Sequence, residues 1–171
     1  MQIFDADTIR RALDWPGLIE ALCAAFRDGS EAPLRHHHTL AVPGEPDATL
    51  LLMPAWTPGR FLGVKIAGVF PGNATRGQPA VQAQYLLMSA ATGEPLALLD
   101  GAELTVRRTA AASALAAGYL ARRDAAHLLL VATGRLAVPL ACAHASVRDY
   151  AQVSVWGRDA GKAAAVAGRL R

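Results

Sequence analysis

Residues 127–159, HLLLVATGRLAVPLACAHASVRDYAQVSVWGRD, decide the fold class of this 171-residue chain. The apolar run at 128–131 predicts a buried strand, 138–150 favours a helix, and 151–159 returns to a strand-like pattern. The helix-like segment AGKAAAVAGRLR (160–171) follows. A strand–helix–strand–helix order that opens on a continuous apolar strand is typical of a parallel sheet covered on both faces. We therefore predict the first half of a Rossmann-type domain, which would need further strands to be complete.

Upstream of this stretch, residues 103–123 (ELTVRRTAAASALAAGYLARR) predict a long helix of small residues that another backbone can approach closely. Residues 30–100 hold strand-like runs separated by turn-rich segments, and ATGEPLALLD (91–100) predicts a hairpin. Residues 5–28 predict two short helices. The predicted class is α/β: an N-terminal α+β domain (1–112) with a mainly antiparallel sheet and a long linking helix, then an incomplete Rossmann domain (113–171).

The amino-acid composition indicates which kinds of partner this protein could bind. Charged residues make up 18% of the chain, below the average of about 25%, which fits a protein that buries surface against a partner or a missing half. The net charge of +3 is spread out, which argues against nucleic acid. No apolar run approaches the roughly 20 residues of a membrane span, and the N-terminus lacks a signal core. Cys23 and Cys142 are far apart and predict free thiols, so we expect a cytoplasmic protein.

The segment Ala132–Ala137, between a strand and a helix, resembles a G-x-G-x-x-G/A phosphate loop. Gly134 holds the second glycine position and Ala137 the third, whereas Ala132 departs from the first. Backbone N–H groups of Thr133–Leu136 (Thr133, Gly134, Arg135 and Leu136) would meet a pyrophosphate at the helix N-terminus. A strand–turn–helix with one glycine is also commonplace without any ligand.

About 20 residues further on, the fingerprint expects an acidic residue for the ribose 2′-hydroxyl. This chain has Arg158 after the second strand, and Asp159 one residue later. An arginine suits a 2′-phosphate, so the sequence favours NADP over NAD. The alternative is that Arg158 and Asp159 merely cap the next helix.

Lys65, in the strand-like run FLGVKIAGVF (61–70), shares one face with small residues. A lysine on such a strand either protects a sheet edge or points into a cleft, and the neighbouring glycines favour the cleft. Arg35 and Arg108 offer planar forks for a carboxylate, although most arginines are solvated surface charges. The run His36–His38 has no acid or cysteine partner at ligand spacing, so we predict loop or strand surface and no metal.

Five features in order over about 75 residues resemble the ornithine cyclodeaminase/mu-crystallin family. They are the lysine strand, the P-G-N turn that follows it (71–73), the T-G-x-P hairpin (92–95), the L-T-x-x-R-T-A-A-x-S helix start (104–113) and the phosphate loop. The resemblance implies an NAD(P)-dependent protein that acts on a small amino or imino acid by hydride transfer. Such proteins are about twice as long, so we expect this chain to be an inactive fragment on its own.

The resemblance also implies roles for individual residues. Lys65 matches the lysine that contacts the substrate near its reacting carbon and is the expected catalytic residue. Arg108 matches the arginine that holds the substrate carboxylate, and it is expected to reach the cofactor as well. Arg35 matches a second carboxylate ligand. The catalytic aspartate of the family has no counterpart before Arg171.

Two departures bear on activity: Ala80 stands where ornithine enzymes carry threonine, and Ala132 replaces the first loop glycine. Three hypotheses follow. The parent protein is an ornithine cyclodeaminase, amino acid dehydrogenase or ketimine reductase; it binds NADPH and small ligands without catalysis; or it is a dimerisation remnant. We expect residues 1–112 to form the domain that binds substrate and pairs with a second copy through the sheet; in the third hypothesis only the pairing remains.

Overall fold

The computed structural model describes residues 1–171 and divides into two compact units. Unit 1 comprises Met1–Ala12 and Asp28–Leu104, and unit 2 comprises Leu13–Arg27 and Thr105–Arg171. The functional domains drawn from the sequence, with their boundary after residue 112, stay a prediction. Each unit has its own sheet.

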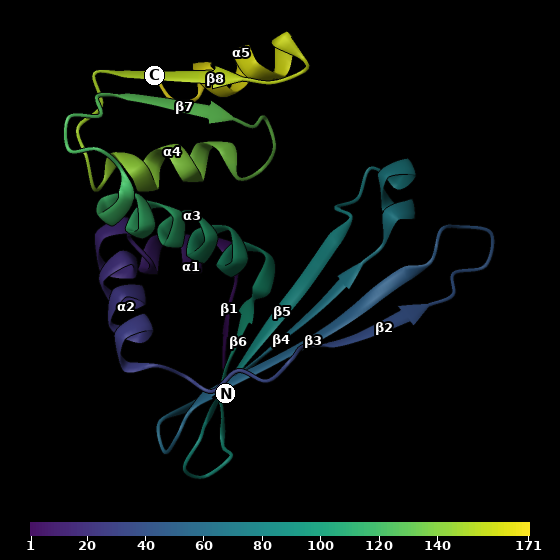
Figure 1. Ribbon diagram of the computed structural model, residues 1–171. Coiled ribbons are helices and arrows are strands. Elements are labelled where there is room, and N and C mark those ends of the chain that lie inside the picture. Colours follow the sequence, from purple (N-terminus) through teal and green to yellow (C-terminus); the bar gives the residue numbers. More distant parts are fainter. The chain divides into compact units, whose positions relative to one another are not determined.

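Unit 1 is built on a six-stranded sheet in the order β1-β6-β5-β4-β3-β2 (Figure 1). Its strands are β1 (Gln2–Phe4), β2 (His36–Leu40), β3 (Ala48–Thr57), β4 (Phe61–Val69), β5 (Val81–Ser89) and β6 (Pro95–Asp100). Every neighbouring pair is antiparallel except β1 with β6. This confirms the mainly antiparallel sheet expected from the sequence, to which the structure adds the short parallel strand β1.

The turns of unit 1 lie in the turn-rich segments of the sequence. Gly93, with φ of 74°, lies in the turn between β5 and β6, which confirms the predicted hairpin. A 3-10 helix, η1 (Pro71–Arg76), follows β4, and Gly77 ends it in the left-handed region at φ 65°. Such positive φ values suit glycine because it has no Cβ.

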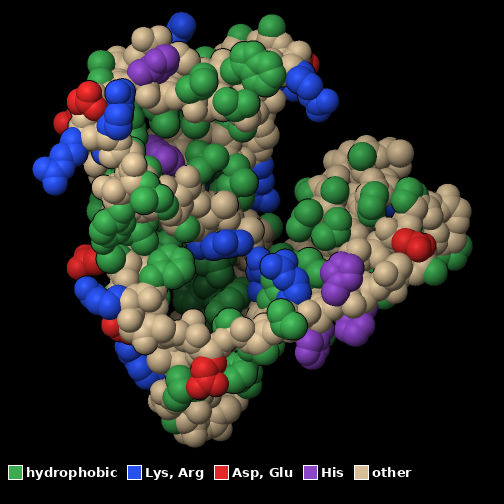
Figure 2. All heavy atoms as spheres, in the orientation of Figure 1, with side chains coloured by type: hydrophobic (Ala, Val, Ile, Leu, Met, Phe, Trp, Pro, Cys, Tyr) green, Lys and Arg blue, Asp and Glu red, His purple; other side chains and the backbone are tan.

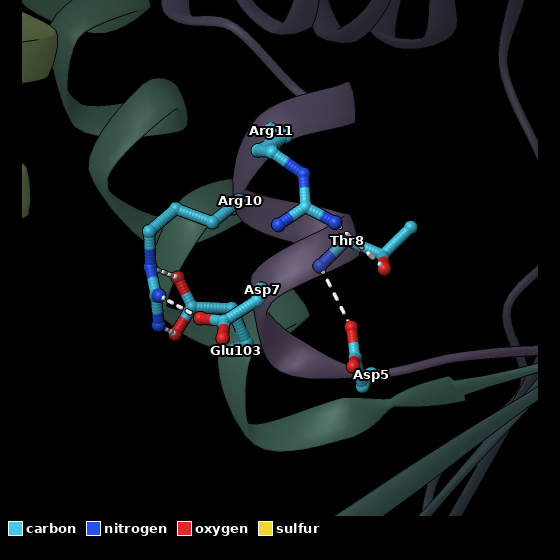
Figure 3. A network of polar contacts seen from close by, with 6 residues as sticks. All are labelled: Asp5, Asp7, Thr8, Arg10, Arg11 and Glu103. Carbon is cyan, nitrogen blue, oxygen red and sulfur yellow. Dashed lines mark hydrogen bonds and ion pairs between the residues drawn. The ribbon is translucent and has the colours of Figure 1, made fainter.

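Helix α1 (Ala6–Ala12) begins where the Asp5 carboxylate accepts a hydrogen bond from the Thr8 N–H at 2.8 Å. The Arg10 guanidinium binds the buried Glu103 carboxylate through both Nε and Nη2 (Figure 3). Glu103 lies in the first turn of α3 (Gly101–Leu120). One bidentate ion pair therefore holds α1 to the beginning of α3, and the Glu103 carboxylate provides favourable charge at that helix N-terminus.

Unit 2 packs helices through small side chains. Helix α2 (Trp15–Asp28) begins at Asp14, whose carboxylate accepts the Gly17 N–H at 2.9 Å. The core of the unit contains alanines of α3 and α4 (Ala137–Ala145) that are fully buried, with larger apolar side chains packed around them; these are Ala110, Ala114 and Ala143, surrounded by Trp15, Ile19 and Leu140. Alanine stabilises the helix and keeps it narrow, so neighbouring elements approach closely.

The second half of unit 2 has the predicted strand–helix–strand–helix order. Strands β7 (His127–Val131) and β8 (Gln152–Trp156) pair in parallel, with α4 between them in the chain and α5 (Ala160–Gly168) after them. This arrangement confirms the beginning of a Rossmann-type sheet. None of the helices in this structure is both long and apolar enough to span a membrane.

Candidate functional site

Lys65 lies in the interior of the unit 1 sheet. Its strand, β4, is paired with β3 on one side and β5 on the other (Figure 1). Lys65 stands directly opposite Met53 and Tyr85 and is partly buried. A lysine that protects an edge must lie on an edge strand, so the edge interpretation is wrong for this residue. The structure thus leaves the second interpretation from the sequence, in which the lysine points into a cleft.

Tyr85 is a neighbour of Lys65 that sequence reasoning missed. The side chains of Gly63, Lys65 and Tyr85 belong to the same face, because opposite residues in an antiparallel pair share a face and alternate residues along a strand do too. A Cβ on Gly63 would collide with the Tyr85 hydroxyl, so the phenol lies over Gly63. Burial raises the pKa of Tyr85 above its ordinary value of 10.0, which keeps the phenol uncharged.

The P-G-N turn after β4 is held by a small polar network. Arg76 pairs with the Glu45 carboxylate and also donates to the side-chain oxygen of Asn73 at 3.4 Å. Asn73 is 8% exposed, and its amide donates to the Pro79 carbonyl at 3.0 Å. Gly72 has no side chain, and the Glu45 carboxylate lies where its Cβ would be. The turn is therefore fixed against the loop between β2 and β3.

The two arginines predicted to bind a carboxylate are both exposed. Arg35 lies in unit 1, immediately before β2, and Arg108 lies in unit 2, on α3. The residue next to Arg108 behaves differently: Arg107 is 7% exposed, and it donates to the Leu13 carbonyl. The motif V-R-R-T therefore contains one arginine that is used in packing and one that faces solvent.

The three consecutive histidines are the first residues of the exposed edge strand β2. His36 and His38 point to the same face, with ring centroids 6.4 Å apart in an edge-to-face arrangement. Figure 2 shows histidine side chains (purple) gathered on the surface over this strand. No group of three or more metal-ligating side chains forms anywhere in residues 1–171.

The loop between β7 and α4 contains Thr133, Gly134, Arg135 and Leu136, all in unit 2. Gly134 is exposed, does not have a positive φ, and has open space where a Cβ would be. No side chain caps the N-terminus of α4 at Leu136. Helix α4 begins three residues after this open glycine, and the Ala137 N–H donates to the Gly134 carbonyl at 3.0 Å. A glycine-containing loop that leads into a helix N-terminus without a side-chain cap fits a pyrophosphate.

The carboxyl end of β8 lies beside this loop. Val131 and Trp156 are in register, and a Cβ on Gly157 would collide with the Thr133 side chain. Arg158 is exposed at this end, whereas Asp159 caps α5 by accepting the Lys162 N–H at 3.0 Å. The capping interpretation is therefore correct for Asp159. Gly157 is a second residue that the sequence alone did not single out.

A model of the ornithine cyclodeaminase/mu-crystallin family matches residues 5–171. The chain belongs to this family. Among curated members, an uncharacterized protein of Schizosaccharomyces pombe is 43% identical over 172 residues, which cover 98% of this chain and 52% of the relative. The Delta(1)-pyrroline-2-carboxylate reductase of Colwellia psychrerythraea is 39% identical over 164 residues, with coverages of 95% and 52%.

Solved structures of the family share the fold. The Delta(1)-pyrroline-2-carboxylate reductase of Thermococcus litoralis, in complex with NADH and L-proline, matches with a TM-score of 0.86 at 28% identity, over 99% of this chain and 53% of that one. An archaeal alanine dehydrogenase dimer with bound NAD matches with a TM-score of 0.87 at 27% identity, with coverages of 99% and 52%. The chain thus spans about half the length of the family members that it matches.

Proposed function

We propose that this chain is part of an NAD(P)-dependent enzyme that reduces a small cyclic imino acid, with 1-pyrroline-2-carboxylate giving proline as the leading reaction. The observation that carries the proposal is the position of Lys65 on an interior strand of a family sheet. A relative that is 39% identical is named Delta(1)-pyrroline-2-carboxylate reductase. A structural neighbour in complex with NADH and L-proline has the same name. Within this proposal, residues 1–112 bind substrate and 113–171 begin the cofactor domain.

In the proposed reaction, a hydride adds to the imine carbon, a proton adds to the nitrogen, and the C=N double bond becomes a single bond. A nicotinamide supplies the hydride. Lys65 contributes a positive charge and a hydrogen-bond donor at the reacting C=N group, where the partly buried setting strengthens electrostatic interactions. Arg35 and Arg108 provide guanidinium groups that bind and orient the carboxylate.

On the cofactor side, the residues of unit 2 fit a dinucleotide. The N–H groups of Thr133–Leu136 would bind the pyrophosphate, and Arg158 would contact the adenosine ribose. Because Asp159 is engaged as a helix cap, Arg158 is the charged residue left at the end of β8 for that ribose. We therefore favour NADP, although the solved neighbours carry NADH or NAD.

The sheet also supports a proposed homodimer. The face opposite Lys65 carries the apolar side chains of Ile3, Leu86, Leu98 and Ile66. Ile3 is 75% exposed and Ile66 44% exposed. Apolar residues that gather on an exposed sheet face are typical of a protein interface. A second copy of the chain would cover them.

The test is steady-state reduction of 1-pyrroline-2-carboxylate by the intact protein, with NADPH and NADH compared by their loss of absorbance. We expect turnover with both cofactors, a lower KM for NADPH, and loss of turnover in Lys65→Ala. Ornithine, supplied with the oxidised cofactor, tests the cyclodeaminase reaction, in which ammonia is released. Tight NADPH binding with no turnover of any amino or imino acid would instead assign a non-catalytic binder of the mu-crystallin kind.

A further inference from the structure

We propose that Tyr85 is a substrate-positioning residue whose phenolic O–H donates a hydrogen bond to the substrate carboxylate, next to Lys65. This inference rests on the proposed function and adds a contact to the same site. Tyr85 and Lys65 are directly opposite each other on neighbouring strands. The Cβ atoms of such pairs are about 4.5–5.5 Å apart, so a ligand that reaches one side chain is within reach of the other.

The glycine in β4 determines where the hydroxyl lies. The phenol extends across Gly63, and its oxygen occupies the volume that a Cβ would take. Gly63 lies two residues before Lys65 on the same face. The glycine therefore provides space for the polar end of the tyrosine, and it places that end alongside the strand that carries the lysine.

The environment of the hydroxyl favours a ligand. Tyr85 is partly buried, and burial raises the pKa of its hydroxyl, so the group stays protonated. The hydroxyl is not one of the fully buried polar atoms that lack a partner, so a ligand can reach it, and a tyrosine O–H in such a partly buried place usually has a hydrogen-bond partner. An anionic acceptor is the best partner for a hydroxyl that stays protonated beside a lysine. The carboxylate of an amino or imino acid is such an acceptor.

The test compares Tyr85→Phe with wild type in the intact protein. Tyr85→Phe keeps the ring and removes one oxygen, so a hydrogen bond to a charged group is the only interaction lost. We expect the KM for 1-pyrroline-2-carboxylate and the Kd for L-proline to rise about tenfold, which corresponds to about 1.4 kcal/mol, because one hydrogen bond to a charged group is lost. The kcat should change less than about twofold, because the bond is present in both ground and transition states.

A second variant, Gly63→Ala, moves the phenol without deleting it, because the new methyl group takes the place of the hydroxyl. It should raise KM in the same direction, and the double variant should be no worse than either single one, because both remove the same contact. Tyr119→Phe is the matched control: Tyr119 is an exposed tyrosine of unit 2, and its loss of a hydroxyl should leave KM unchanged.

Two results would overturn the inference. If wild type turns over but Tyr85→Phe has an unchanged KM and only a lowered thermal midpoint, Tyr85 is a packing residue and the proposed function stands. If wild type neither turns over nor binds L-proline, the proposed function fails and the role of Tyr85 fails with it.

Discussion

The Arg107 guanidinium lies over the indole ring of Trp15, with 4.0 Å between the guanidinium carbon and the ring centroid. Its neighbour in the sequence, Arg108, is exposed on the same helix. Successive residues of a helix point about 100° apart, so two adjacent arginines reach different environments. This separation assigns Arg107 to the packing of α2 and α3 within unit 2, and leaves Arg108 exposed to solvent.

Arg107→Ala should lower the free energy of unfolding by about 2 kcal/mol, because it removes a buried cation–π contact and a charge-assisted hydrogen bond to Leu13. Arg108→Ala should change stability by less than about 0.5 kcal/mol, as exposed positions do. It should raise the KM for the amino or imino acid about tenfold or more. Urea unfolding and steady-state kinetics measure the two effects. The reverse pattern would show that Arg108 is the structural residue.

Gly134→Ala should separate cofactor binding from stability. Its Cβ would meet no protein atom, and its φ is compatible with alanine, so stability should stay equal or rise by up to about 1 kcal/mol. If a pyrophosphate approaches this backbone, the Kd for NADPH should increase about tenfold or more. Gly118→Ala, an equally open glycine in α3, is the control and should leave the Kd unchanged. An unchanged Kd in Gly134→Ala would remove this loop from the cofactor site.

Gly157→Ala should behave differently from Gly134→Ala, because its Cβ would collide with the Thr133 side chain. The substitution forces β8 and the phosphate loop apart, so both stability and NADPH affinity should fall. Thermal unfolding and nicotinamide fluorescence follow the two properties. Restored stability and affinity in the double variant Thr133→Ser with Gly157→Ala would show that the methyl group of Thr133 is the obstacle.

His144 should make unit 2 less stable in mild acid. Its Nε2 lies 3.1 Å from the Ser113 hydroxyl, its Nδ1 is buried without a partner, and burial lowers the pKa of the ring below 6.5. Above pH 6.5 the ring is neutral in both folded and unfolded chains, so it contributes no pH dependence. As the pH falls through 6.5, the unfolded chain binds the proton first, and stability is lost until the folded pKa is reached.

The measurement is urea unfolding of wild type and His144→Gln at pH 7.5 and 5.5. Glutamine keeps a polar group towards Ser113 and does not titrate in this range. Wild type should lose more stability than the variant between the two pH values. Equal losses would mean that other groups cause the acid sensitivity.

The ion pair between Arg10 and Glu103 should matter more than the one between Arg10 and Asp7 (Figure 3). Glu103 has a buried carboxylate, with its side chain 6% exposed, whereas the Asp7 side chain is 70% exposed. Arg10→Met leaves the buried carboxylate without this partner, and Asp7→Asn removes only a surface charge. The thermal midpoint should fall clearly in the first variant and hardly in the second. Equal midpoints would show that Glu103 does not depend on Arg10.

Local chemistry made several elements predictable from the sequence. Asp5 and Asp14 precede their helices as capping residues, and a turn between β5 and β6 needs the positive φ of Gly93. Each of these signals lies within a few residues of the feature that it causes. The apolar run FLGVKIAGVF likewise placed Lys65 on a strand, but it did not show whether that strand lies at an edge or in the interior of the sheet.

Features that depend on distant parts of the chain could not be predicted. The three residues of β1 are too few to show a period, and they become a strand only by pairing with β6, more than 90 residues later. The contact between Gly63 and Tyr85 depends on the register of two strands. Burial distinguishes Arg107 from Arg108, and neither composition nor spacing carries that information.

The interior position of β4 has a consequence for motion. Amide groups of a strand that is paired on both sides exchange with solvent only when a neighbouring strand separates or the whole unit unfolds, so Lys65 should be among the slowest-exchanging positions of unit 1. Edge strands such as β2 open far more readily. The backbone that carries the proposed catalytic lysine is therefore a rigid platform on the timescale of turnover, and any adjustment to a bound substrate at that residue must come from side-chain rotation.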